Sequence, residues 1–262
     1  MAVFTDLTDS DRDLIATAYR LGPLTSVIGI ADGDTETTFL FRSSRGEFIV
    51  TLFENGADPL DLERAFRTME TLTVAGIPCP RTIRTEQGAA TIMASGKLVA
   101  VVGFVHGSLA RVATYEKCLA LGAIAAQIQT ALAKPGRTGT GLPMGSVHGA
   151  LTKDNVFFVD SKVSGVINFR LRHDAILISE LADMLVHWSV GADGKLHGPL
   201  AEGILTGFES IRTLSVGEKH ALPAFVMAAA AAYFANKGDL VNLEERTHAT
   251  FISAQSLVHR RG

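Results

Sequence analysis

The sequence has little cysteine and no long apolar run. Cys79 and Cys118 are its two cysteines, and they stand far apart, outside any C-x-x-C spacing. This pattern is typical of reduced, buried thiols, so we expect a cytoplasmic protein. The most apolar segment, residues 224–235, is shorter than the ~20 residues of a membrane-spanning helix. The first twenty residues carry four aspartates where an export signal would be basic and apolar. We therefore expect no membrane partner.

Charge of either sign is also scarce. The net charge is -3, with 19% charged and 47% hydrophobic residues. This composition indicates a globular protein rather than a disordered one, and it gives no electrostatic reason to expect nucleic acid as a partner. A chain of 262 residues is long enough for one large domain or two small ones.

The first hundred residues alternate apolar strands with helices. Thr8-x-x-Asp11 predicts a capped helix over 8–20, and Asp58-Pro59 begins a second helix that Gly76 ends. Apolar runs separated by turn residues predict strands at 26–30, 39–42, 47–53, 90–93 and 98–105. The pattern predicts an antiparallel sheet that carries helices.

After Phe104 the composition becomes helical. Helical spacing covers residues 114–132, 179–188, 200–213, 216–237 and 240–259. Residues 134–145 hold four glycines and two prolines, which favours a loop. A mostly β part followed by a mostly helical part predicts a two-lobed α+β protein with its junction near Phe104.

The stretch from Val147 to Phe169 carries the chemical signal. Phosphotransferases of the protein-kinase type have a His-x-Asp motif, an Asn five residues after the Asp, and then an apolar strand ending in Asp-Phe. His148 and Asn155 have this spacing, but Ala150 stands at the first aspartate position and Asn168 at the second. The frame of the motif is present without its two carboxylates.

Several segments together resemble the bacterial homoserine kinases of the aminoglycoside phosphotransferase and choline kinase superfamily. The resemblance runs nearly from end to end and rests on residues 1–6, 29–31, 48–54, 76–80, 142–145, 154–158, 164–169, 214–215 and 221–223. It implies a protein-kinase-like fold of the aminoglycoside-phosphotransferase type. Residues 1–103 would form an N-terminal β-rich nucleotide lobe, 104–107 a hinge, and 108–262 a helical C-terminal lobe with the catalytic-loop remnant.

The resemblance also assigns roles to the altered motif. Ala150 occupies the position of the catalytic base, and loss of a general base typically costs about 10²–10⁴-fold in rate. Asn155 and Asn168 would be the metal ligands, but neutral amides suit Mg²⁺ less well than carboxylates do. Asp154 is adjacent and supports the loop in that family. His148 is either a loop anchor bonded to nearby backbone or a proton-transfer group, and the lack of a carboxylate partner beside it favours the anchor.

The nucleotide would lie against the first strands. The candidate nucleotide-binding residues are Gly29, Gly33, Thr35, Thr37, Thr51 and Phe104. Glycines can bring backbone N–H groups close to phosphates, although a hairpin that requires special backbone dihedral angles also explains them. The family further has a longer helical segment where this chain has only residues 129–148, with Gln129 at a family histidine position. The wall around an amino-acid substrate would therefore be reduced.

Two functions follow from these departures. The leading hypothesis is a catalytically impaired pseudokinase with a binding or regulatory role, which holds a nucleotide or small molecule in the cleft between the lobes, or a protein partner such as an active paralogue. The alternative is a slow or repurposed ATP-dependent kinase, whose family reaction converts L-homoserine to O-phospho-L-homoserine in threonine biosynthesis. ATP and Mg²⁺ would be the cofactors in both cases, with weakened binding.

Overall fold

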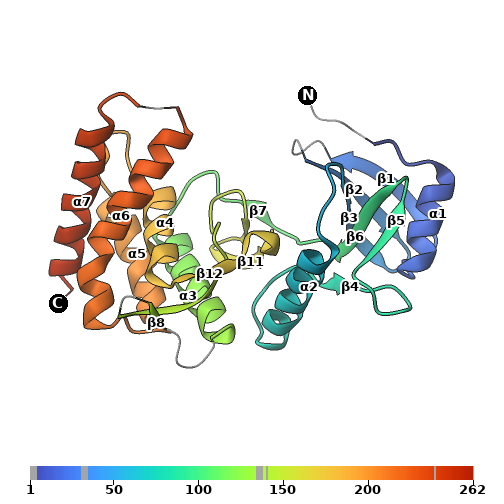
Figure 1. Cartoon of the computed structure of the whole chain (residues 1–262), viewed down its shortest axis with the longest axis horizontal. Coiled ribbons are helices and arrows are strands. Elements are labelled where there is room, and N and C mark those ends of the chain that lie inside the picture. Colours follow the sequence, from blue (N-terminus) through green and yellow to red (C-terminus); the bar gives the residue numbers. More distant parts are fainter. Residues whose placement is uncertain (1–4, 31–34, 134–137, 140, 239, 262) are drawn as a thin grey trace. The chain divides into compact units, whose positions relative to one another are not determined.

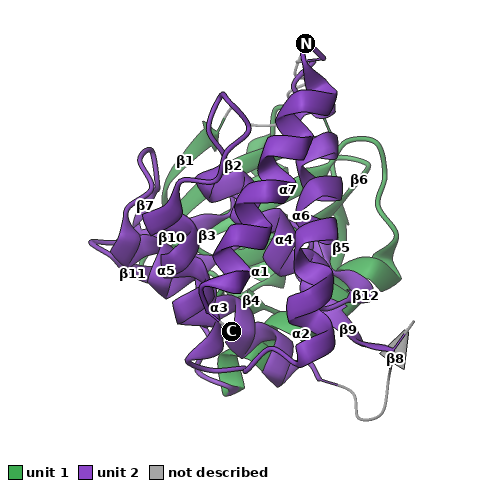
Figure 2. Ribbon diagram, turned by 90° about the vertical axis from the view of Figure 1, so that its left-hand side faces the viewer, with its two compact units in different colours: residues 1–74, 79–105 green, residues 75–78, 106–262 purple. Residues whose placement is uncertain are grey.

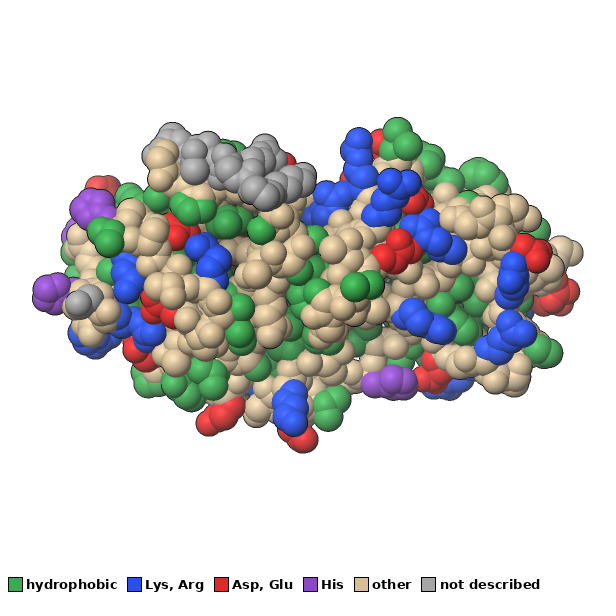
Figure 3. All heavy atoms as spheres, turned by 90° about the horizontal axis from the view of Figure 1, so that it is seen from below, with side chains coloured by type: hydrophobic (Ala, Val, Ile, Leu, Met, Phe, Trp, Pro, Cys, Tyr) green, Lys and Arg blue, Asp and Glu red, His purple; other side chains and the backbone are tan. Residues whose placement is uncertain are grey.

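The computed structural model describes residues 5–30, 35–133, 138–139, 141–238 and 240–261. The chain divides into two compact units (Figure 2). Unit 1 comprises Met1–Val74 and Cys79–Val105, and unit 2 comprises Ala75–Pro78 and His106–Gly262. Basic and acidic side chains are interspersed over the face drawn in Figure 3. No helix in the described part of the chain has both the length and the apolarity needed to cross a lipid bilayer.

Unit 1 is an antiparallel sheet with two helices (Figure 1). Its elements are α1 (Asp9–Ala18), β1 (Leu24–Ile30), β2 (Glu36–Ser43), β3 (Gly46–Phe53), α2 (Pro59–Val74), β4 (Thr82–Ile83), β5 (Thr91–Ala94) and β6 (Lys97–Gly103). The strand order is β1-β2-β3-β6-β4, with β5 also paired to β6. The predicted hairpin and third strand are confirmed.

Local signals explain both helices of unit 1. Thr8 and Asp11 form the predicted capping box at the start of α1. The backbone N–H of Leu60 donates to Asp58 at 2.9 Å, so Asp58 caps α2 as predicted. The apolar side of α2 is buried at Leu62, Phe66, Met69 and Leu72. The core beneath the sheet is built from Ile15, Phe41, Val50, Leu52 and Val101.

Unit 2 is mainly helical. Its helices are α3 (Tyr115–Ala131), α4 (Ile178–Ser189), α5 (Gly198–Glu209), α6 (Val216–Asn236), α7 (Leu243–His259) and the short 3₁₀ helix η1 (Phe169–Leu171). Helix α3 packs closely on α5, where a Cβ at Gly207 would lie 1.9 Å from the carbonyl oxygen of Leu119. A side chain at Gly207 would therefore force these helices apart.

Two small sheets lie among the helices of unit 2. One has the order β11-β10-β7 and contains β7 (Ser108–Leu109), β10 (Val156–Val159) and β11 (Lys162–Val166). The other has the order β12-β9-β8 and contains β8 (Thr138–Gly139), β9 (Leu142–Val147) and β12 (His173–Ile176). The loop prediction for 134–145 was wrong at 138–139 and 142–145. There, β9 pairs with the distant β12 and β8 pairs with β9, and this antiparallel pairing outweighs the local composition. Residues 134–137 and 140 lie outside the described residues.

Candidate active site

The predicted catalytic loop connects β9 to β10, and His148 at its start is fully buried. The Nε2 atom of His148 lies 2.8 Å from the carbonyl oxygen of Ile167. The Nδ1 atom accepts a hydrogen bond from the N–H of Ala150 at 3.2 Å. Because a carbonyl oxygen only accepts, Nε2 carries the proton of the neutral ring. Burial lowers the pKa of His148 to about 4, so the ring is a neutral link between two backbone segments.

Glu180 on α4 holds the backbone of the same loop. Its Oε1 atom accepts hydrogen bonds from the N–H groups of His148 at 2.6 Å and Gly149 at 3.1 Å. Its Oε2 atom accepts from the side-chain amide of Gln129 at 3.0 Å. Burial raises the pKa of Glu180, and these three hydrogen bonds oppose that effect. No motif marks Glu180, which is one of two acidic residues in α4, with Asp183.

Two further side chains close the loop. The indole N–H of Trp188 donates to the carbonyl oxygen of Leu151 at 2.7 Å. The side-chain amide of Asn155 donates to the carbonyl oxygen of Ala150 at 2.9 Å. Both backbone polar groups of Ala150 are therefore satisfied, and the loop keeps a fixed backbone although position 150 has only a methyl group.

The second altered position lies on an exposed turn. Asn168 has left-handed backbone dihedral angles of φ 72° and ψ 41°, and it precedes η1 without a side-chain capping bond. Asparagine tolerates this conformation better than most residues do. Asp154 is exposed, and its charge acts on His187 of α4. The structure thus places Asp154 at the loop surface.

The two candidate metal ligands do not fit a Mg²⁺ ion held in the usual way. Mg²⁺ is a hard cation that proteins bind through one or two carboxylates together with substrate phosphates. Asn155 and Asn168 supply only neutral amide oxygens at the two ligand positions. Within the described ranges, no three His, Cys, Asp or Glu residues are grouped so that they could hold a metal ion.

The predicted nucleotide-binding residues of unit 1 have varied surroundings. Thr37 is 1% exposed, and its hydroxyl accepts from the N–H of Thr5 at 3.3 Å and donates to Glu54. Thr35 is exposed, and its carbonyl oxygen accepts from the N–H of Glu54 at 3.0 Å. The hydroxyl of Thr37 is thus bonded within unit 1.

The other candidates in unit 1 belong mainly to the sheet. Gly29 lies on β1, where a Cβ would make only an ordinary contact of 3.8 Å with Phe39. Thr51 is half-buried on β3, and the N–H of Phe104 donates to the carbonyl oxygen of Glu47 at 3.0 Å. Gly33 lies outside the described residues.

A buried ion pair joins β6 to the end of β3. The Nζ atom of Lys97 lies 2.5 Å from a carboxylate oxygen of Glu54, whose side chain is 5% exposed. Burial alone would raise the pKa of Glu54, but hydrogen bonds from Lys97 and Thr37 outweigh it and lower the pKa to about 2. No sequence motif marks this pair, because its two members are distant in the chain.

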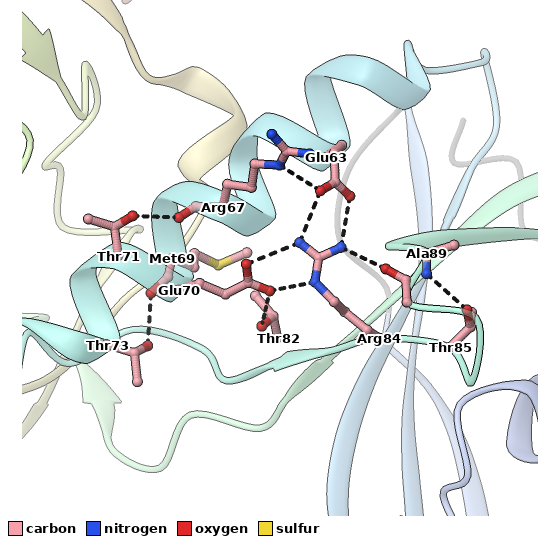
Figure 4. Close-up of polar contacts among 11 residues, drawn as sticks. Glu63, Arg67, Met69, Glu70, Thr71, Thr73, Thr82, Arg84, Thr85 and Ala89 are labelled. Atoms are coloured by element: carbon pink, nitrogen blue, oxygen red, sulfur yellow. Dashed lines mark hydrogen bonds and ion pairs between the residues drawn. The ribbon is translucent and has the colours of Figure 1, made fainter.

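One arginine binds two of the acidic residues of α2 (Figure 4). Arg84, just after β4, pairs with Glu63 at 2.9 Å and with Glu70 at 2.6 Å. Hydrogen bonds from Arg84 lower the pKa of both carboxyl groups. This pairing fastens α2 to the edge of the sheet.

Comparisons with known proteins agree with this arrangement. Residues 26–140 match the model of the "Phosphotransferase enzyme family". A homoserine kinase of Xanthobacter autotrophicus is 31% identical, over 88% of this chain and 85% of the relative. One of Gluconacetobacter diazotrophicus is 30% identical, over 88% of this chain and 86% of the relative.

Solved structures share the fold at low sequence identity. An amicoumacin kinase in complex with AMP-PNP and Ca²⁺ has a TM-score of 0.68 at 12% identity, covering 97% of this chain and 94% of that one. An aminoglycoside phosphotransferase from Alicyclobacillus acidocaldarius has a TM-score of 0.67 at 14% identity, covering 88% and 92%. A spectinomycin phosphotransferase in complex with ADP has a TM-score of 0.57 at 12% identity, covering 95% and 97%. The prediction of an α+β, aminoglycoside-phosphotransferase-type fold is confirmed.

Proposed function

Because the chain belongs to the homoserine kinase-like phosphotransferases, we propose that it is a catalytically impaired member of this family with a binding or regulatory role. One observation carries the proposal. Glu180, Trp188 and Asn155 hold the catalytic loop in a fixed backbone, while positions 150 and 168 carry no carboxylate. Such a site keeps the backbone conformation needed to bind a ligand. It lacks the carboxylates that would accept a proton and coordinate a magnesium ion.

The ligand proposed for this site is a nucleotide or a small molecule. The support is that related structures were obtained with AMP-PNP or ADP. Residues 1–103 would be the nucleotide lobe, 104–107 the hinge and 108–262 the other lobe. Magnesium would contribute little, because Asn155 and Asn168 offer no formal charge. A thermal-shift titration with ATP, with and without Mg²⁺, should therefore give a stabilisation that depends weakly on the metal. The absence of any shift with ATP would count against nucleotide binding.

Restoration of the carboxylates tests the impairment directly. We expect the double variant Ala150→Asp with Asn168→Asp to raise turnover of homoserine and ATP by about 10²-fold or more over the unsubstituted chain. The matched control is Ala150→Asn, which has the size of aspartate without its charge and should restore nothing. Turnover of the unsubstituted chain at an ordinary kinase rate of roughly 1–100 per second would contradict the proposal. If the double variant is also inactive, the loss of activity is instead due to the shortened segment between Gln129 and His148.

The second candidate is a slow or repurposed ATP-dependent small-molecule kinase. The observation that favours it is the loop backbone itself, since Ala150 keeps both of its backbone hydrogen bonds in a well-anchored turn. Loss of a base that is worth about 10²–10⁴-fold would leave roughly 10⁻⁴–1 turnovers per second. Such a rate is measurable with purified protein.

A further inference from the structure

Two histidines, His148 and His173, lie near position 150, where the base is missing. They differ in how many of their ring nitrogens are hydrogen-bonded. Both nitrogens of His148 are engaged with backbone atoms. His173, at the start of β12, has its Nδ1 atom 3.1 Å from the carbonyl oxygen of Leu171. Because that oxygen only accepts, Nδ1 carries the proton and Nε2 keeps its lone pair. In the described part of the chain, Nε2 of His173 has no hydrogen-bond partner, and the residue is exposed.

The ring of His173 is packed against the catalytic loop. His173 pairs with Val147 across the β9–β12 ladder. A Cβ at Gly149 would lie only 2.6 Å from Cε1 and 2.8 Å from Nδ1 of His173. Glycine is thus required at position 149, where φ is also +80°. The imidazole therefore lies against the residue directly before Ala150.

Several titratable groups surround His173. Asp183 comes from α4, where burial raises its pKa to about 6 and the charge of His173 opposes that shift. Asp174 on β12 accepts a hydrogen bond from the hydroxyl of Ser146 at 2.8 Å. Glu180 is bonded to the loop, and His148 is neutral at physiological pH. Asp183 is thus a carboxylate on a neighbouring helix whose charge interacts with that of His173.

We propose that Nε2 of His173 accepts the proton of a small alcohol substrate, in place of the carboxylate missing at position 150. This rests on the second candidate function, slow phosphoryl transfer. In the step, the hydroxyl O–H bond breaks and an Nε2–H bond forms. The alcohol oxygen bonds to the terminal phosphorus of a nucleoside triphosphate while the bond from that phosphorus to the nucleoside diphosphate breaks. The arrangement of a bound Nδ1–H and an available Nε2 is the one that imidazole bases use in hydrolases.

The test is turnover of homoserine and ATP by the full chain and its variants. In His173→Asn, the side-chain amide can still donate to Leu171, but the base is lost. We expect its turnover to fall by about 10²-fold, and the acid limb of the pH–rate profile to disappear. The matched control is His220→Gln on the exposed surface of α6, which should change neither. Adding Ala150→Asp to His173→Asn should restore the rate, since an aspartate would then supply the base.

The outcomes separate this proposal from the proposed function. Unchanged turnover and pH profile in His173→Asn would overturn the role of His173 and leave a slow kinase with another base. No turnover by the unsubstituted chain would overturn both the role and the slow kinase, while the ATP thermal shift would still report binding. Nitrogen chemical shifts should show neutral His173 protonated on Nδ1 and His148 on Nε2. A proton on Nε2 of neutral His173 would also overturn the proposal.

Discussion

Unit 1 and unit 2 each bury a carboxylate, and the two carboxylates have different partners. In unit 1, Glu54 is paired with Lys97, so a cation offsets its charge. In unit 2, Glu180 accepts hydrogen bonds from two loop N–H groups and from the amide of Gln129. The difference teaches that the shape of the catalytic loop is set by a carboxyl group outside the loop. An alanine at position 150 therefore leaves that shape intact.

The largest effect is expected when the unit 2 carboxylate is removed. Glu180→Ala leaves the N–H groups of His148 and Gly149 without an acceptor, and each such donor costs about 1–3 kcal/mol. The amide of Gln129 loses one hydrogen bond but keeps the one to the carbonyl oxygen of Leu177. We expect the free energy of unfolding to fall by about 3–5 kcal/mol in urea titrations at neutral pH. Glu245→Ala, on the exposed surface of α7, is the control and should stay within about 0.5 kcal/mol. Equal losses in both variants would show that Glu180 does not anchor the loop.

The stabilising contribution of His148 in unit 2 should be lost at a higher pH than that of Glu54 in unit 1. The pKa of His148 is lowered from 6.5 to about 4, so between these values the unfolded chain binds a proton that the folded chain excludes. The contribution of His148 to the free energy of unfolding should thus fall as the pH drops below 6.5, by up to about 1.4 kcal/mol per pH unit. The contribution of Glu54 is fully present above pH 4.5 and is lost only as the pH falls toward 2.

Urea titrations between pH 7 and pH 5 check this difference. His148→Gln keeps a donor for the carbonyl oxygen of Ile167 but cannot titrate, so its stability should have a smaller slope with pH. Identical slopes in the two proteins would contradict a buried, neutral His148.

A smaller effect is expected for the ion pair of unit 1. Lys97→Met leaves the carboxylate of Glu54 buried without its cation. Breaking a buried pair costs about 3–5 kcal/mol, but Lys97 is 25% exposed and water can partly replace it. We therefore expect a loss of about 2 kcal/mol in the free energy of unfolding. Lys195→Met is the control, since Lys195 is 71% exposed and lies 3.9 Å from Asp193. A loss no larger than that of the control would show that Glu54 does not need its lysine.

The features that could be predicted from the sequence are those determined by residues close together in the chain. The capping box of Thr8 and the Asp58-Pro59 start of α2 are local, and both were found. The motif spacing found His148 and Asn155, because a short loop fixes their separation. By contrast, β12 and most of β9 were missed, since their pairing joins segments far apart in the chain.

The missed site residues depend on similar long-range contacts. Glu180 meets the loop N–H groups from more than thirty residues away. Its only local signal was an acidic side chain in α4, a helix with many apolar residues. His173 had no motif to mark it, and its position against Gly149 follows from the β9–β12 register. Residues whose partners are distant in the chain are thus the ones that a single sequence conceals.

The smallest effect on the free energy of unfolding is expected at the exposed turn of Asn168, where an aspartate should be tolerated. Asn168 has φ of 72°, a conformation that Asn and Asp both tolerate and that costs alanine about 1–2 kcal/mol. Asn168→Asp should therefore change the free energy of unfolding by less than about 0.5 kcal/mol, and Asn168→Ala should lower it by about 1 kcal/mol. Urea titrations of the two variants measure the difference. If aspartate costs as much as alanine, then the turn itself excludes the carboxylate, and the neutral residue at 168 reflects backbone geometry rather than a changed chemistry.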